Sequence, residues 1–218
     1  MKALNRILLL PILSLIFIFS ACFKKTGGQN NSISTDSSNI KKDKVIQSPD
    51  SSSITSVLTE EIIDKTSDRD LLQIVSDNLF KKLPKDYSKE YNKVITFNKS
   101  QQAIFVIWEL ETEVNNGGFN QYYFNSSGQY AKLTPNALQL VGAKQFADLM
   151  SRANEIYQKN YDKIIKDQDG TLDGFSKSYK GNPLNKLDEE FYKLYNNEKL
   201  ESIQISYIRK NKDQFIDK

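Results

Sequence analysis

The most distinctive stretch of this sequence runs from residue 113 to residue 128 and reads EVNNGGFNQYYFNSSG. Its two adjacent glycines, Gly117 and Gly118, permit a sharp turn and a close backbone approach. Amide side chains surround them, and amides can satisfy the backbone groups left open at a helix end. The stretch therefore predicts a helix that ends at the glycines, a short aromatic helix after them, and a second helix end at the Asn-Ser-Ser-Gly run.

Before this stretch, apolar residues recur every three or four positions, which is the spacing of an amphipathic helix. The spacing predicts one helix from about Arg69 to Leu83, capped by Thr66-Ser67-Asp68 and stopped by Pro84. A second helix is expected to begin after Ser100. The run Ile104–Trp108 is also compatible with a buried strand, although its flanks favour a helix.

After the stretch, Thr134 and Pro135 predict an N-cap and a first-turn proline, and Gly142 interrupts the helix that follows. The segment from Asp167 to Pro183 has the composition of a loop. Two more amphipathic helices are expected, around Leu187 to Tyr195 and Leu200 to Phe215. We therefore predict an all-α or nearly all-α fold: one compact domain of about six to eight helices over residues 57–218.

The N-terminus has the pattern of an export signal. Basic Lys2 and Arg6 precede a nearly continuous apolar run at residues 7–19, which is short of the roughly 20 residues that a membrane-spanning helix needs. Ser20 and Ala21 then precede Cys22, the only cysteine. This order resembles a bacterial lipobox with Phe19 in place of the usual leucine, and predicts a lipoprotein signal peptide at 1–21 with a diacylglycerol on Cys22. The alternative is a plain secretory signal or an N-terminal anchor, with Cys22 incidental.

Residues 22–56 would then be the lipidated cysteine and a disordered linker, because serine, asparagine and lysine dominate and large apolar residues are few. The expected location is the bacterial cell envelope, with the domain outside the cytoplasm and attached to the membrane through Cys22. Phe23 is not the aspartate of an inner-membrane retention signal. In a cell with two membranes this favours the outer one.

Composition narrows the possible chemistry. The 218 residues include no histidine and one cysteine, which excludes an internal disulfide framework, the usual zinc, haem and iron–sulfur ligand sets, and histidine-dependent catalytic triads. We expect no metal and no cofactor. The sequence pI of 8.7 reflects an excess of lysine and arginine in residues 1–56, since residues 57–218 carry 23 basic and 24 acidic residues. No nucleic-acid partner is expected.

The central stretch resembles the signature of the DNA mimic protein nineteen family, which has an E-x-x-N-G-G-F-x-Q-Y-x-x-N core. The matching residues are Glu113, Asn116, Gly117, Gly118, Phe119, Gln121, Tyr122 and Asn125. The resemblance continues through residues 141–143, 187–192 and 207–209, and covers about residues 68 to 218. It implies a helical fold and, for the activity in the family's name, an acidic surface that imitates DNA phosphates and occupies a DNA-binding protein.

That activity needs a strong negative field, because duplex DNA carries one charge per roughly 1.7 Å of its axis. A domain with a net charge of −1 supplies little of it, despite local acidic clusters at residues 109–113 and 188–190. Export would also separate the domain from cytoplasmic DNA-binding proteins. The DNA-mimic function is therefore disfavoured.

Two other functions remain open. Glu109 and Glu113 lie four residues apart on one helix face, so the pair could serve a cell-envelope hydrolase, which burial of both carboxylates in a cleft would favour. No nucleophile–base pair is visible, and we expect no catalytic residues. The motif would instead stabilise the fold or bind a protein or peptide partner, and exposed Phe119, Tyr122 or Tyr123 would favour binding. The sequence leaves a homodimer open.

Overall fold

The computed structural model describes residues 57–169 and 171–217, and in these residues all regular structure is helical. The α-helices are α1 Glu60–Lys65, α2 Asp68–Lys81, α3 Glu90–Val94, α4 Lys99–Phe124, α5 Thr134–Val141, α6 Lys144–Lys159, α7 Tyr161–Ile165, α8 Leu172–Ser178, α9 Asn185–Asn197 and α10 Leu200–Lys210. Three short 3₁₀ turns, Tyr87–Lys89, Ser126–Tyr130 and Lys212–Gln214, complete the list.

The all-α prediction is confirmed. The helices α1, α3 and α7 have six residues or fewer, and the seven other described α-helices fall within the expected six to eight. The strand alternative for Ile104–Trp108 is wrong, because these residues lie in the first half of α4. The predicted signal peptide, Cys22 and the linker lie outside the described residues.

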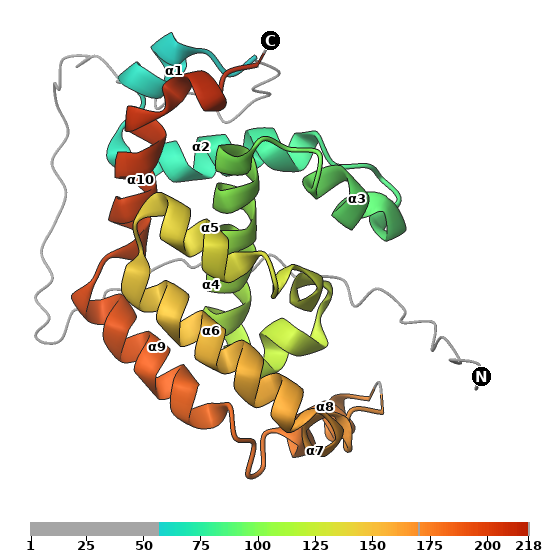
Figure 1. Ribbon diagram of the computed structural model, residues 1–218. Helices are drawn as coiled ribbons and strands as arrows, with labels where there is room; N and C mark the ends of the chain where they lie inside the picture. Colours follow the sequence, from blue (N-terminus) through green and yellow to red (C-terminus); the bar gives the residue numbers. More distant parts are fainter. Residues whose placement is uncertain (1–56, 170, 218) are drawn as a thin grey trace, which may run out of the picture. The chain divides into compact units, whose positions relative to one another are not determined.

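Helix α4 occupies the centre of the helical unit (Figure 1). It contacts α2, α5 and α9, while α6 packs on α5 and α9. One full turn in its first half is buried on every side, since Ile104, Phe105, Val106 and Ile107 are at most 1% exposed. A helix that is apolar all round belongs in a protein core. The central position of α4 fixes where the glycine stretch lies.

The helix boundaries follow local signals, but several differ from the predicted ones: α2 ends at Lys81 and not at Leu83, α4 begins at Lys99 and not after Ser100, and α10 ends at Lys210 and not at Phe215. The side chain of Asn98 accepts a hydrogen bond from Gln101 N–H (2.9 Å) and caps α4. Gly142 ends α5 with a φ of 98°. Thr134 was expected as an N-cap but is the first residue of α5 itself, because its hydroxyl donates back to the carbonyl of Tyr130 (2.9 Å).

The predicted loop at residues 167–183 contains a helix that the sequence did not indicate. Thr171 caps α8 by accepting a hydrogen bond from Gly174 N–H (3.0 Å). Phe175 then packs on Phe124 at the end of α4, with 4.8 Å between ring centroids. The loop prediction is therefore wrong for Leu172–Ser178, which form a helix held by tertiary contacts.

The two ends of the described segment meet. Leu58 and Asp217 exchange hydrogen bonds, from Leu58 N–H to Asp217 Oδ2 (2.7 Å) and from Asp217 N–H to the Leu58 carbonyl (2.9 Å). Lys82 adds an ion pair to Asp217 (2.6 Å). Among the described residues, no helix combines the length and the apolar character needed to cross a membrane.

Candidate functional site

The candidate site is the break in α4 at Gly117 and Gly118, where the backbone leaves helical geometry and then resumes it. Gly118 has a φ of 69°, in the left-handed region that favours glycine. A Cβ at Gly118 would lie 2.5 Å from Asp188 Oδ2 of α9, closer than real atoms approach. The N–H of Phe119 donates to Asp188 Oδ1 (2.7 Å). The predicted turn is confirmed, and it forms a joint with α9.

Tyrosine side chains satisfy carbonyl groups on the other side of the break. Tyr179, just after α8, donates its hydroxyl to the Gly117 carbonyl (2.7 Å). Tyr192 of α9 donates to the Val114 carbonyl (2.7 Å). Carbonyls at a helix end lack partners within the helix, so the two tyrosine hydroxyls replace the hydrogen-bond donors that these carbonyls lose at the break. Burial raises the pKa of Tyr179 to about 12, so its hydroxyl keeps the proton that it donates.

The amides of the motif divide into two groups. Gln121 Nε2 and Asn125 Nδ2 both donate to Glu113 Oε2, at 2.7 and 2.8 Å, and so tie the two halves of α4 together. Asn120 is fully buried, donates to Ser178 Oγ (2.7 Å), and accepts from the side chain of Asn182 (2.9 Å). Glu113, Gln121 and Asn125 are thus brought together across the turn.

Sequence reasoning missed Asn120 and Asp188 as site residues. Asn120 lies inside the quoted stretch, but at a variable position of the family core. Asp188 belonged to an acidic cluster that was considered for surface charge. Asp188 is half-buried, and burial raises the pKa of its carboxyl while the Phe119 N–H opposes that rise. The only available signal was its place in the second block of the family resemblance, residues 187–192.

The three aromatic residues proposed as groove markers are buried. Phe119 and Tyr122 are 0% exposed and Tyr123 is 8% exposed. Phe119 packs edge-on against Phe191 (6.0 Å between centroids), and Tyr123 stacks on Tyr157 (4.0 Å). These rings stabilise the core and do not form an open groove. Of the motif residues, Asn116 is exposed, and its side chain makes no hydrogen bond with any described residue.

The carboxylates of the hydrolase alternative have different surroundings. Glu113 accepts the two amides described above, whereas Glu109 has no hydrogen bond to the described residues. Burial, together with the smaller effects of the charges of Glu90 and Glu113, raises the pKa of Glu109 to about 8. Glu109 therefore holds a proton at neutral pH. A shallow hollow in the described residues lies elsewhere, between α5 and α10, and is lined by Val141, Ile203 and Tyr207.

The described residues contain no group of three or more histidine, cysteine, aspartate or glutamate side chains arranged to hold a metal ion.

Within each of the two local acidic clusters, the carboxylates make different contacts. Glu111 is 9% exposed and Glu113 is bonded to amides, so the first cluster does not form a surface stripe. In the second cluster, Asp188 turns into the joint and Glu190 pairs with Arg152 of α6.

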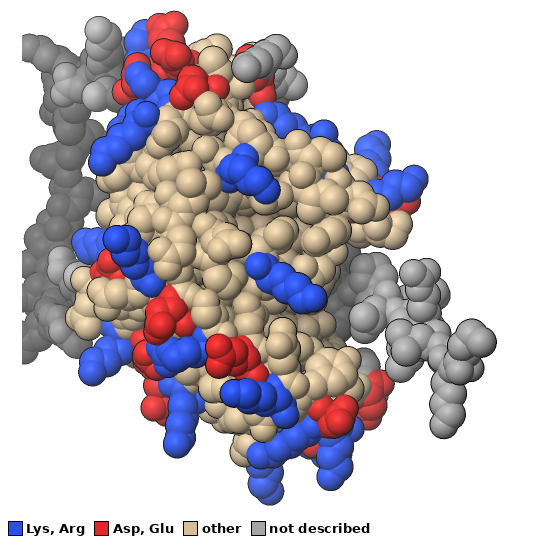
Figure 2. Space-filling view, in the orientation of Figure 1, with Lys and Arg blue, Asp and Glu red and all other residues tan. Residues whose placement is uncertain are grey.

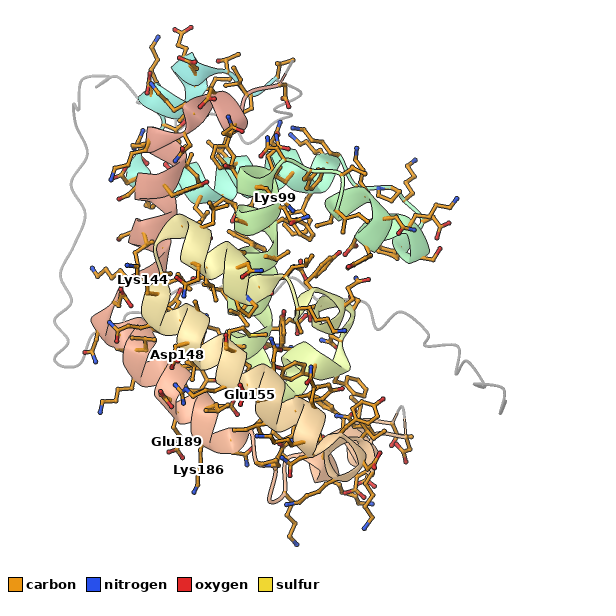
Figure 3. The ribbon with its side chains drawn as sticks, in the orientation of Figure 1. Lys99, Lys144, Asp148, Glu155, Lys186 and Glu189 are labelled. Atoms are coloured by element: carbon orange, nitrogen blue, oxygen red, sulfur yellow. The ribbon has the colours of Figure 1, made fainter. Side chains whose placement is uncertain are left out.

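The exposed charges mix both signs. Figure 3 shows Lys144 and Asp148 along α6, and Lys186 and Glu189 along α9, on one side of the molecule. Figure 2 shows acidic and basic groups interleaved over these helices, with few charges over the middle of the same face. This face therefore has no continuous acidic strip of the kind that imitates a phosphate backbone.

A family model described as DMP19-like protein matches residues 95–211, more than half of the chain. The chain belongs to this family. The family resemblance of the central stretch is confirmed, over a shorter range than the predicted 68–218. The DMP19-like region runs from the end of α3 through α10 and includes the glycine break, its amides and Asp188. No curated protein and no solved structure is significantly similar to the chain.

Proposed function

We propose that the chain is a lipid-anchored, extracytoplasmic module whose DMP19-like domain binds a protein or peptide partner without catalysing a reaction. The observation that supports this most directly is the state of Asn116. It belongs to the motif that carries the family resemblance, yet it is exposed and its side chain has no hydrogen-bonding partner among the described residues. Packing therefore gives no reason for an asparagine at this position.

The surroundings of Asn116 suit recognition. The joint beneath it is rigid, because Asp188, Tyr179 and Tyr192 all bond to backbone groups of the break. Exposed polar groups on a fixed scaffold are the usual location of binding residues. An asparagine amide both donates and accepts, which matches the N–H and C=O of a peptide backbone. A neutral amide carries no net charge, so it adds no long-range attraction to the phosphates of a nucleic acid.

The same contacts weigh against the two other functions. A DNA mimic presents its carboxylates to solvent, but the carboxylates of Glu111, Glu113 and Asp188 accept hydrogen bonds from other groups of the domain. A hydrolase of the paired-carboxylate type needs both acids to face a substrate cleft. In this domain the Glu113 carboxylate already accepts two amide donors.

Partner capture from envelope extracts tests the proposal, with the full chain as bait. Asn116→Ala is the test variant, and Asn136→Ala is the matched control, because Asn136 is an exposed asparagine on α5 outside the motif. We expect the wild type and Asn136→Ala to retain a partner that Asn116→Ala loses, with helicity and Tm unchanged in both variants. Equal capture by all three proteins would show that Asn116 is not part of a binding surface.

The proposed anchor rests on the order of residues at the N-terminus: Lys2 and Arg6, the apolar run at 7–19, and Ser20-Ala21-Cys22. Cys22→Ser removes the thiol that would carry the lipid. We expect the wild type in the membrane fraction with the mass of a diacylglycerol adduct, and the variant without the adduct. A wild-type mass that retains residues 1–21 without lipid would contradict the proposal.

A further inference from the structure

A buried contact between α4 and α10 lies apart from the glycine break. Gln204 of α10 donates its Nε2 to Glu111 Oε2 of α4 at 2.6 Å. Glu111 is 9% exposed and Gln204 is 0% exposed, so water has little access to either side chain. Buried polar groups are normally paired completely, because an unpaired one loses its hydration without compensation.

This contact is incomplete as long as Glu111 is ionised. The second polar atom of the amide, Gln204 Oε1, is buried and has no hydrogen-bond partner. It is an acceptor, and an ionised carboxylate offers it only further acceptors. A protonated carboxyl differs because it carries an O–H donor. One proton on Glu111 would therefore supply the donor that Gln204 Oε1 lacks.

We propose that Glu111 holds a proton in the folded protein and pairs with Gln204 as a carboxylic acid with an amide. The resulting ring of two hydrogen bonds joins α10 to α4 at acidic pH and is lost at alkaline pH. In the ring, the amide N–H donates to the carboxyl oxygen and the carboxyl O–H donates to Gln204 Oε1. When pH rises, the proton leaves to solvent. Gln204 Oε1 then faces a negative carboxylate, and the contact becomes repulsive on that side.

The titratable groups around Glu111 are consistent with this assignment. Burial, with a smaller effect of the charge of Glu201 on α10, raises the pKa of the Glu111 carboxyl to about 7, although hydrogen bonds from Gln204 and from Tyr195 of α9 oppose the rise. Burial also raises the pKa of Tyr195, so this neighbour stays neutral and only donates. Glu201 is exposed. None of these neighbours is a cation that would hold Glu111 in its ionised form.

The first test follows the Glu111 carboxyl directly, by its ¹³C chemical shift in the full wild-type chain as pH is raised from 4 to 9. We expect a midpoint near pH 7. A midpoint at the ordinary value of a glutamate, about 4.3, would overturn the proposal. This measurement needs no variant, so it decides the matter even if substitutions at Glu111 prevent folding.

The second test compares the Tm of the wild type, Glu111→Gln and Glu201→Gln from pH 5 to pH 8. A glutamine at position 111 can make both hydrogen bonds to Gln204 at any pH, whereas Glu201→Gln removes only a nearby exposed charge. We expect the fall in Tm between these pH values to be smaller in Glu111→Gln than in the wild type by roughly 5 °C, and nearly unchanged in Glu201→Gln. An equal fall in Tm in all three proteins would show that Glu111 and Gln204 do not form this acid–amide pair.

Discussion

Two glycines of this domain adopt positive φ at the end of a helical run, but they do so for different reasons. At Gly142, with a φ of 98°, an added Cβ would meet nothing within 4 Å, and Ala143 N–H closes the cap on the Leu138 carbonyl (2.8 Å). At Gly118, with a φ of 69°, an added Cβ would overlap Asp188. Gly142 is thus required by local backbone geometry alone, whereas Gly118 is required by geometry and by the packing of α9.

The largest expected effect is that of Gly118→Ala. At the Gly118 backbone (φ 69°, ψ −174°), which is in a region adopted almost only by glycine, the substitution combines strain of about 1–3 kcal/mol with a steric overlap of about 1–3 kcal/mol, so we expect the free energy of unfolding to fall by roughly 3 kcal/mol or more. Gly142→Ala is the comparison variant and should lose only about 1–2 kcal/mol, since its backbone (φ 98°, ψ 5°) is left-handed helical, and an added Cβ would meet nothing within 4 Å. Urea denaturation of both variants measures the difference. Equal losses would mean that the two glycines serve the same purpose.

The sequence predicted both glycine breaks because each depends on residues that are adjacent in the chain. It did not predict that Gly118 contacts Asp188, since the hydrogen bond from Phe119 to Asp188 spans 69 positions. The acidic run at residues 188–190 was interpreted as surface charge. In the structure, Asp188 supports the break and Glu190 pairs with Arg152. Local pattern thus locates the turn, but its partner depends on how distant helices pack.

The helix α8 shows the same limit for the fold. Apolar spacing predicted the core helices, because their buried faces repeat along the chain. Leu172 begins α8 but is 81% exposed, so no such face marks this helix in the sequence. Its position is fixed by the buried side chains of Asn120, Ser178 and Asn182, which join residues 58 and 62 positions apart. Contacts of this kind leave no periodic pattern to recognise.

The second prediction concerns pH, because the Gly118 joint has carboxylates connected to it. The charge of Glu113 contributes to the raised pKa of Glu109, and the Glu113 carboxylate accepts a hydrogen bond from Gln121, whose side chain lies beside Gly117. The pKa of Glu109 is raised to about 8 in the folded protein. The unfolded chain releases this proton near pH 4.5, so the free energy of unfolding should fall as pH rises from about 4.5 to 8 and then level off.

Glu109→Gln removes this titration. The variant should match the wild type near pH 4 and exceed its free energy of unfolding by roughly 2–3 kcal/mol at pH 8.5. Urea denaturation at the two pH values gives the comparison. A variant that is less stable than the wild type at pH 8.5 would mean that Glu109 is ionised and favourably paired in the folded state.

The third prediction separates the charge of Asp188 from its hydrogen bond. Asp188→Ala leaves the Phe119 N–H without its acceptor, and we expect a loss of about 1–2 kcal/mol in the free energy of unfolding. Asp188→Asn retains a carbonyl oxygen for the same N–H and removes a half-buried charge, so it should stay close to the wild type. If both variants lose the same amount, the charge and not the hydrogen bond stabilises the joint.

The smallest expected effect is at Asn116, directly before the break. The fold places no hydrogen-bonding demand on this side chain, so Asn116→Ala should change the free energy of unfolding by less than about 0.5 kcal/mol. Asn136→Ala on α5 should behave alike, since both asparagines are exposed. A loss above about 1 kcal/mol at Asn116 alone would give this residue a role in the joint. Equal and negligible changes would leave recognition of a partner as the remaining reason for an asparagine beside Gly117.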